Sequence, residues 1–292
     1  MSSAFRPLPA ALLASLAAPV ALLAQGTPPT YAYSANCGWI NVAPINRAAI
    51  DVNETFLAGN IYGANIGWIR MGDGTPANGH SYANNSADDF GVNQDGCGNL
   101  SGYAYSANCG WVNFQWTADP NDPNRPHFDL DDGEFHGFAY GANIGWVNLG
   151  TGYLAVQNIN RPDTDADGID DNWETKWFGN LTTAGIGTDQ DGDGMSDASE
   201  AIADTDPMDA NDYLKIVSHT YSNGQTTVDL AFTSQPSRRY QLHHSTDLSA
   251  WTDSGLGTFA PDSGTTTART FSFTGNTRHF FRAVAVLPLQ AP

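Results

Sequence analysis

Two twelve-residue stretches of this sequence carry carboxylates at a shared and regular spacing. The first, from Asp163 to Glu174, reads Asp-Thr-Asp-Ala-Asp-Gly-Ile-Asp-Asp-Asn-Trp-Glu. The second, from Asp189 to Glu200, reads Asp-Gln-Asp-Gly-Asp-Gly-Met-Ser-Asp-Ala-Ser-Glu. Both match the pattern D-x-[DN]-x-[DN]-G-x5-E at every specified position. In such a loop the acidic side chains converge, the glycine permits a sharp turn, and the final glutamate closes an oxygen-rich shell around Ca²⁺.

The pattern assigns a full set of oxygen ligands to two calcium ions. Position seven contributes a backbone carbonyl, position nine acts through water, and the other positions contribute carboxylates. The first set is Asp163, Asp165, Asp167, Ile169, Asp171 and Glu174. The second set is Asp189, Asp191, Asp193, Met195, Asp197 and Glu200. Only four glutamates occur in the chain, and two of them stand at position twelve of these loops, so we expect Ca²⁺ as the cofactor.

These loops resemble EF-hand-like and thrombospondin type 3-like calcium repeats of extracellular proteins. They depart from a full EF-hand because Pro162 precedes the first loop and Gly185, Gly187 and Thr188 precede the second, so neither has an entering helix. Short helices are expected after the loops, over Asp171 to Phe178 and over Ser196 to Ala203. Trp173 and Trp177 would meet Ala198, Ala201 and Ile202 in a miniature core. This arrangement favours structural calcium over a sensor.

The charge of the chain is concentrated around the two loops. Between Arg161 and Asp212 lie 15 of the 31 carboxylates, and the whole chain has a formal net charge of -19. Such an excess repels phosphate backbones, which excludes nucleic acid as a partner. Asp204, Asp206 and Asp209 follow the second loop, and we interpret them as a solvated turn before Pro207, with a further calcium site as the alternative.

The N-terminal half contains four copies of one phrase. They begin at Tyr31, Ile61, Tyr103 and Phe138, and each runs through Ala-Asn-x-Gly-Trp. Alternating aromatic and small residues, an Asn-x-Gly turn and a Trp-[Ile/Val] return indicate a β-hairpin in each copy. Asp-Gly turns at Asp95-Gly96 and Asp132-Gly133 add an earlier strand, which makes meanders of copies three and four. The phrase resembles tryptophan-and-glycine β repeats of secreted bacterial proteins.

The repeats leave three features open. One hairpin cannot bury its own face, so a solenoid, a propeller-like closure and a sandwich are all compatible with the pattern. Trp39, Trp68, Trp111 and Trp146 occupy equivalent positions, as do Asn36, Asn65, Asn108 and Asn143. We interpret the tryptophans as core residues and the asparagines as turn residues, with exposed polysaccharide-stacking rings as the alternative. The residue between the asparagine and the glycine of each turn is Cys37, Ile66, Cys109 or Ile144, and we call this apolar position the slot. Whether Cys97 pairs with Cys37 or with Cys109 is undecided.

The C-terminal segment has the pattern of a small β-sandwich. Strands are expected over Tyr213 to Val217, Thr226 to Phe232, Arg239 to His244, Arg269 to Phe273 and Arg278 to Val286. This segment loosely resembles a fibronectin type III-like module. His243 and His244 are adjacent, so in a strand they point to opposite sides and cannot chelate one ion together.

The sequence thus predicts a mainly β protein: a β-repeat (meander) domain at 25–157, a calcium-loop and short-helix connector at 158–212, and a β-sandwich at 213–292. Residues 1–24 have the charged start and the apolar run of a signal peptide, and no transmembrane segment is expected in the mature chain.

The expected function is that of a secreted or cell-surface calcium-binding protein of adhesion or matrix, with an extracellular protein or polysaccharide as partner. Polysaccharide binding by the repeats is the alternative. No catalytic motif occurs, so no enzyme is predicted. A glycoside hydrolase using Asp129, Asp131, Asp132 or Glu134 is the weakest interpretation.

Overall fold

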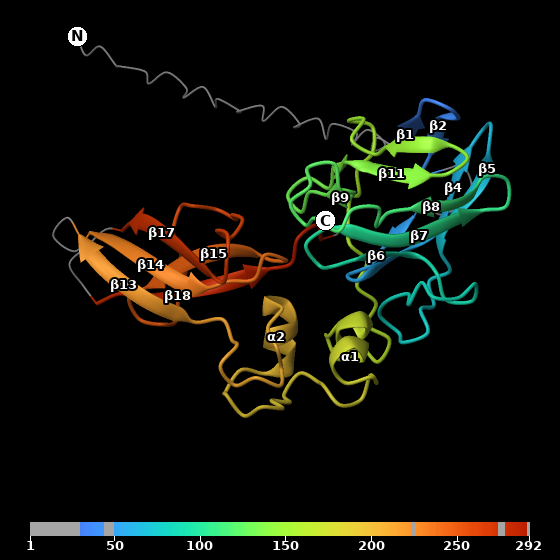
Figure 1. Ribbon diagram of the computed structural model, residues 1–292. Helices are drawn as coiled ribbons and strands as arrows, with labels where there is room; N and C mark the ends of the chain where they lie inside the picture. The colour runs from blue at the N-terminus through green and yellow to red at the C-terminus, as the bar shows by residue number, and fades with distance from the viewer. Residues whose placement is uncertain (1–29, 44–49, 223–225, 274–277, 291–292) are drawn as a thin grey trace, which may run out of the picture.

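The computed structural model describes residues 30–43, 50–222, 226–273 and 278–290, and Figure 1 shows their arrangement. The predicted signal peptide, 1–24, lies outside the described residues. A large antiparallel sheet is built from the N-terminal repeats, two short helices follow, and two three-stranded sheets complete the chain. The protein is therefore mainly β, as the sequence predicts. The boundaries between the expected domains stay predictions.

Each of the four repeats forms one β-hairpin, which confirms that prediction. The hairpins are β1 (Tyr31–Ser34) with β2 (Gly38–Asn41), β4 (Phe56–Gly63) with β5 (Gly67–Gly72), β7 (Leu100–Ser106) with β8 (Gly110–Asn113), and β11 (Phe138–Gly141) with β12 (Gly145–Asn148). The glycine before each tryptophan has a positive φ, between 68° and 80°, which a residue with a Cβ rarely adopts.

The hairpins join side by side into a closed, barrel-like ring. Neighbouring hairpins pair through β2–β4, β5–β7, β8–β11 and finally β12–β1, where Tyr33 faces Asn148. One continuous sheet thus replaces the stacked solenoid, the separate propeller blades and the two-sheet sandwich that the sequence leaves open. Ala32 and Ser34 are buried in its interior, and a closed sheet of eight strands has an interior that side chains just fill.

Additional short strands border the ring. β3 (Asp51–Val52) and β6 (Val92–Gln94) both pair with β4, and β6 also pairs with β7. β9 (His127–Phe128) and β10 (Phe135–His136) pair with each other around the Asp132-Gly133 turn. The Asp-Gly turns therefore do connect antiparallel strands.

The interior of the ring is filled by aliphatic side chains and not by the tryptophans. The buried positions directly after the tryptophans are Ile40, Ile69, Val112 and Val147. The tryptophans themselves are between 39 and 51% exposed, so the interpretation that they fill the repeat core is wrong. An eight-stranded ring has an interior only wide enough for modest side chains, and the alternation of the strand then places the large rings outside.

The repeat asparagines connect neighbouring hairpins. Each side-chain Nδ2 donates a hydrogen bond to a backbone carbonyl in the slot position of the preceding hairpin. The four bonds are Asn36 to Ile144 at 3.2 Å, Asn65 to Cys37 at 3.0 Å, Asn108 to Ile66 at 3.0 Å, and Asn143 to Cys109 at 3.1 Å. These bonds form a circuit that passes through all four repeats, so the asparagines do more than shape their own turns.

The slot side chains are matched in volume to the residue three positions earlier. Where the slot holds Cys37 or Cys109, that residue is Ser34 or Ser106. Where it holds Ile66 or Ile144, the residue is glycine, and a Cβ on Gly63 would lie 2.6 Å from Cγ1 of Ile66. All four slot side chains are buried, and the three cysteines are free. Ser-Cys and Gly-Ile pairs therefore alternate around the ring.

The chain after the helices forms two sheets of three strands. The first consists of β13 (Ile216–Ser222), β14 (Thr227–Thr233) and β17 (Thr266–Ser272), and the second of β16 (Thr252–Asp253), β15 (Arg239–Ser245) and β18 (Phe280–Val286). They share a core that includes Phe232, Tyr240 and Leu242. The expected strand over Tyr213 to Val217 is wrong in its bounds, because Thr233 binds the backbone at Tyr213 and Lys215 before regular pairing begins.

The volume matching in the slot makes a testable prediction. Gly63→Ser adds a side chain against Ile66, and such overpacking costs about 1–3 kcal/mol. Combining it with Ile66→Cys recreates the Ser-Cys pair of repeats one and three, so we expect the double variant to be more stable than the sum of the single changes predicts. Urea unfolding of the two single variants and the double variant measures this coupling. Strict additivity would contradict the matching.

Candidate calcium sites

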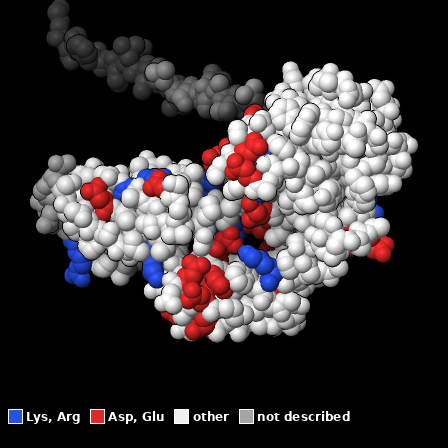
Figure 2. All heavy atoms as spheres, viewed as in Figure 1, with Lys and Arg blue, Asp and Glu red and all other residues white. Residues whose placement is uncertain are grey.

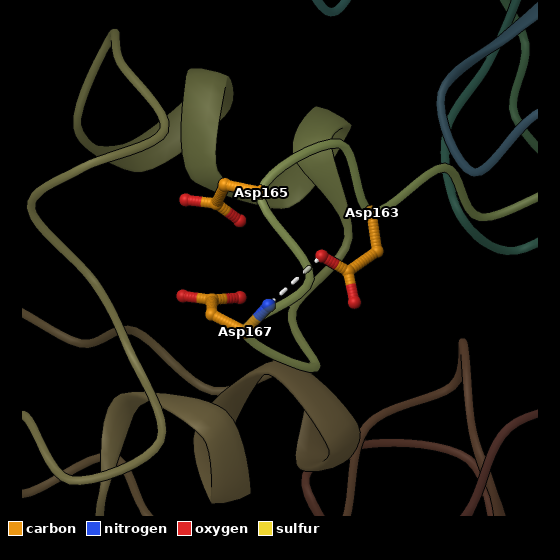
Figure 3. Close-up of side chains that lie close together, drawn as sticks. All are labelled: Asp163, Asp165 and Asp167. Carbon is orange, nitrogen blue, oxygen red and sulfur yellow. Dashed lines mark hydrogen bonds between the residues drawn. The ribbon is translucent and has the colours of Figure 1, made fainter.

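The first acidic loop brings three carboxylates together. Asp163, Asp165 and Asp167 each place an oxygen within 4.8 Å of the others. Figure 3 shows these three side chains on the loop. The loop is held by its own backbone, because Asp163 accepts hydrogen bonds from the amides of Asp167 at 3.1 Å and Gly168 at 3.0 Å. Gly168 has φ +90°, which supplies the sharp turn expected at position six.

The second loop repeats this geometry. Asp189, Asp191 and Asp193 form a cluster with the same 4.8 Å limit between oxygens. Asp189 accepts hydrogen bonds from the amides of Gly192 at 2.8 Å and Gly194 at 3.1 Å. The structure thus brings together positions one, three and five of both predicted ligand sets.

Most of the buried carboxylate oxygens without a hydrogen-bond partner fall on ligand positions of the motif; the exceptions are Oδ2 of Asp170, at position eight of the first loop, and Oε2 of Glu54, which forms an ion pair with Arg161. Both side-chain oxygens of Glu174 are unpartnered, although this residue has 0% of its surface exposed. Oδ2 of Asp167, at position five of the same loop, is also unpartnered. In the second loop the corresponding atoms are Oδ2 of Asp191, Oδ2 of Asp193 and Oε2 of Glu200. A buried anion without a partner is costly, and a divalent cation would remove that cost.

Burial and the repulsion between neighbouring carboxylates raise the pKa values of Glu174 and Glu200. Burial, followed by the charges of Asp167 and Asp165, raises the pKa of Glu174 to about 7. Burial also raises the pKa of Glu200 to about 7, with a contribution from Asp191 and an opposing hydrogen bond from Thr205. Both carboxyls therefore take up protons near neutrality when no cation balances the loop charge.

The residues at position nine serve the loop backbone. Asp171 accepts hydrogen bonds from the amide and the hydroxyl of Thr164, at 2.8 and 2.5 Å. Asp197 accepts from the amide of Gln190 at 3.1 Å and from the hydroxyl of Thr188 at 2.5 Å. Each of these carboxylates belongs to the first residue of a helix and binds the backbone amide at position two of the loop, so it links the start of the loop to the start of the helix. Ile169 and Met195, the predicted carbonyl ligands, donate from their amides to the carboxylates of Asp167 and Asp193.

Each loop leads directly into a short helix. α1 (Asp171–Trp177) begins after the N-cap Asp170, and α2 (Asp197–Ala203) begins after the N-cap Ser196. Gly179, with φ +69°, follows α1 as the expected stop. Ile169, Trp173 and Ala184 form the miniature core, with Trp177, Phe178, Ala198 and Ala201 against it. Ile202 does not join this core and is exposed, so its expected place in the miniature core is wrong.

The other carboxylates considered from the sequence take part in turns and ion pairs. Asp206 and Asp209 accept backbone hydrogen bonds within their own turn, as expected. Asp204 departs from the expected solvated turn, because it accepts a hydrogen bond from Ser237 and lies beside the buried Arg238. Asp129 and Asp131 form ion pairs with Arg239. Asp132 accepts a hydrogen bond from the amide of Glu134 at 2.8 Å. His243 and His244 have separate surroundings, with Arg282 beside the first and Phe271 beside the second.

A buried arginine that sequence reasoning missed joins the helices to both groups of sheets. Arg238 is 2% exposed and donates to Glu54 Oε1 at 2.7 Å and to the carbonyls of Ala201 and Ile202 at 3.0 and 2.8 Å. Arg161 forms an ion pair with the other oxygen of Glu54 at 2.8 Å. We call these three charged residues, Arg238, Glu54 and Arg161, the clamp. The rarity of glutamate and of basic residues in this chain was the available signal.

Position four has a positive φ in both loops, so substitutions there can measure the cost of this backbone conformation. Ala166, at position four of the first loop, has φ +63°, whereas the second loop has Gly192 there with φ +77°. We expect Ala166→Gly to raise the free energy of unfolding and Gly192→Ala to lower it, each by about 1 kcal/mol. A Cβ on Gly192 would meet no atom within 4 Å, so backbone strain alone is tested. Chemical denaturation in excess calcium measures both; equal effects of the same sign would contradict a cost of positive φ at this position.

The raised pKa values predict how stability depends on pH. In the unfolded chain the two glutamates titrate near 4.5, and in the calcium-free fold near 7. Between these values the folded state binds more protons, so the free energy of unfolding should fall as pH rises from about 5 to about 7.5. With saturating calcium the trend should reverse, because protons then compete with the ion. Thermal melts of calcium-depleted and calcium-loaded protein across this range test the reversal. Glu174→Gln with Glu200→Gln should reduce the calcium-free slope, and the remainder comes from Asp170, whose pKa is also raised to about 7.

Comparison with protein-family models, with curated proteins and with solved structures gives no match for this chain. Among the described residues, no helix has the length and apolarity needed to cross a membrane.

Proposed function

We propose that this chain is a secreted, calcium-binding modular protein of adhesion or extracellular matrix, in which calcium stabilises the connector between two β units. The observation that carries the proposal is the burial of Glu174 with both carboxylate oxygens unpartnered beside Asp163, Asp165 and Asp167. Ca²⁺ prefers oxygen ligands and tolerates the irregular set that such a loop provides. The second loop supports a second ion on a smaller number of atoms, because Glu200 is buried beside Asp189, Asp191 and Asp193 with one oxygen unpartnered, while its other oxygen accepts a hydrogen bond from Thr205.

The clamp explains why calcium in the connector would affect the whole molecule. Glu54 precedes β4 of the ring, Arg161 precedes the first loop, and Arg238 precedes β15. The carbonyls that receive Arg238 belong to α2, which also carries Glu200. Ordering of α2 by calcium therefore supports the contact between the ring and the C-terminal sheets, as expected of a stiff spacer.

A calcium titration with matched variants tests this function. At 1 mM calcium and a dissociation constant near 0.1 mM, typical of extracellular modules, each site should add about 1.4 kcal/mol to the free energy of unfolding. The expected shift for two sites is a rise of several degrees in melting temperature between chelator and calcium. Glu174→Gln with Glu200→Gln should abolish this rise, whereas Glu134→Gln, an exposed glutamate outside the loops, should leave it intact.

The same samples report on the connector as a spacer. Small-angle X-ray scattering should give a larger radius of gyration in chelator than in calcium if calcium supports the clamp. If titration calorimetry shows two bound ions but the radius of gyration does not change, calcium binding is supported and the role of the connector as a calcium-dependent spacer is refuted. Absence of bound calcium together with an unchanged melting curve would refute the proposed function itself.

Polysaccharide binding is the second candidate function. The observation that favours it is the exposure of all four repeat tryptophans on the outside of the ring. The repeat asparagines are engaged in the inter-hairpin circuit, so the rings are the part of this hypothesis that the structure leaves accessible.

A further inference from the structure

The outside of the ring is an aromatic surface with almost no charge. Each repeat tryptophan packs against the tyrosine opposite it in the hairpin, with ring centroids 4.8 to 5.1 Å apart. In the eight strands of the ring, Arg70 is the one charged residue, and it pairs with Asp73. Figure 2 shows this contrast, because carboxylates gather around the helices while the visible face of the ring is nearly free of charge. A neutral surface on a chain of net charge -19 is informative about its ligand.

One of the four tryptophans borders a groove. A volume of about 450 Å³ is lined by the aromatic residues Trp111, Tyr103 and Phe90 and by residues 84–87. Phe90 lies edge-on to Trp111 with centroids 4.9 Å apart, and Tyr105 contacts the same ring at 4.8 Å. These contacts fix the orientation of the indole, while 45% of Trp111 stays exposed. The volume falls within the range of small-molecule and oligomer subsites.

The polar wall of the groove is held in place by its own hydrogen bonds. Asn84 donates from its side chain to the carbonyl of Tyr82 at 3.2 Å and accepts from the amide of Gly91 at 3.1 Å. The hydroxyl of Ser86 accepts from the amides of Asp88 and Asp89. Asn85 is exposed, and no hydrogen bond of its side chain exists within the described part of the chain. A preformed wall with an available amide lowers the ordering cost of binding.

We infer that this groove is a subsite for a neutral polysaccharide, with Trp111 as the stacking platform and the Asn85 amide as a hydrogen-bond partner for sugar hydroxyls. The apolar face of a pyranose packs on an indole, and its hydroxyls require neutral donors and acceptors of the kind an amide provides. No charged side chain lines the groove among the described residues. The negative charge of the chain disfavours anionic glycans and single-stranded nucleic acid, the other ligands that use aromatic platforms.

Affinity electrophoresis and titration calorimetry with soluble polysaccharides test this inference, with mixed-linkage β-glucan, xylan and galactomannan as neutral probes and alginate as the anionic probe. The mature chain should bind at least one neutral probe and not alginate. Trp111→Ala should weaken binding at least tenfold, and Asn85→Ala about threefold. Trp146→Ala is the matched control, because Trp146 occupies the same repeat position but packs on Trp116 outside the groove, and its affinity should stay within about twofold.

Three results would each overturn the inference: no binding of any neutral probe, equal losses in the Trp111 and Trp146 variants, or Trp111-dependent binding of alginate. Asn85 is exposed, so its variant stays informative if Trp111→Ala fails to fold. None of the predicted calcium ligands lines the groove, which is formed by β7, β8 and the loop between β5 and β6, so equal affinity in calcium and in chelator is expected. A failure of the calcium proposal is therefore distinguishable from a failure of this one.

Discussion

The arrangement of this protein depends on one buried cation. Arg238 is enclosed by the ring, the helices and its own sheet, and its guanidinium satisfies Glu54 together with two carbonyls at the end of α2. Removal of one partner from such a buried pair typically costs about 3–5 kcal/mol, because the remaining charge is left without compensation. The planar fork of arginine suits several acceptors at once, which the ammonium of lysine does not. Three parts of the chain therefore share a single set of hydrogen bonds.

The clamp and the calcium loops differ in their balance of charge: the clamp has more positive than negative side chains, and each loop has a cluster of negative ones. Around Glu54 two arginines compensate one carboxylate, whereas in each loop three carboxylates converge. Asp170 lies between them, and burial with the charge of Glu54 raises its pKa to about 7. Two of the few basic residues thus hold separate parts of the chain together at Glu54, whereas the clustered carboxylates of the two loops form no ion pair among the described residues.

The sequence was informative where the structure is local. The Asn-x-Gly turns, the glycines at position six and the cap residues of both helices act within a few residues, so their positions could be predicted. Whether Trp39 faces inward or outward depends on the curvature of the whole sheet, which strand alternation alone does not determine. Arg238 and Glu54 are far apart in the chain and belong to no motif, so their pairing required the tertiary structure.

Closure of the ring has a consequence for the order in which the chain can fold. β1 finds its second neighbour only in β12, more than a hundred residues later, so the last hairpin must be present before the first is fully paired. Until then both outer strands offer unpaired backbone groups to any other extended chain. A nascent or truncated polypeptide that ends before Gly145 would remain prone to self-association, and such long-range pairing predicts slow acquisition of the native state.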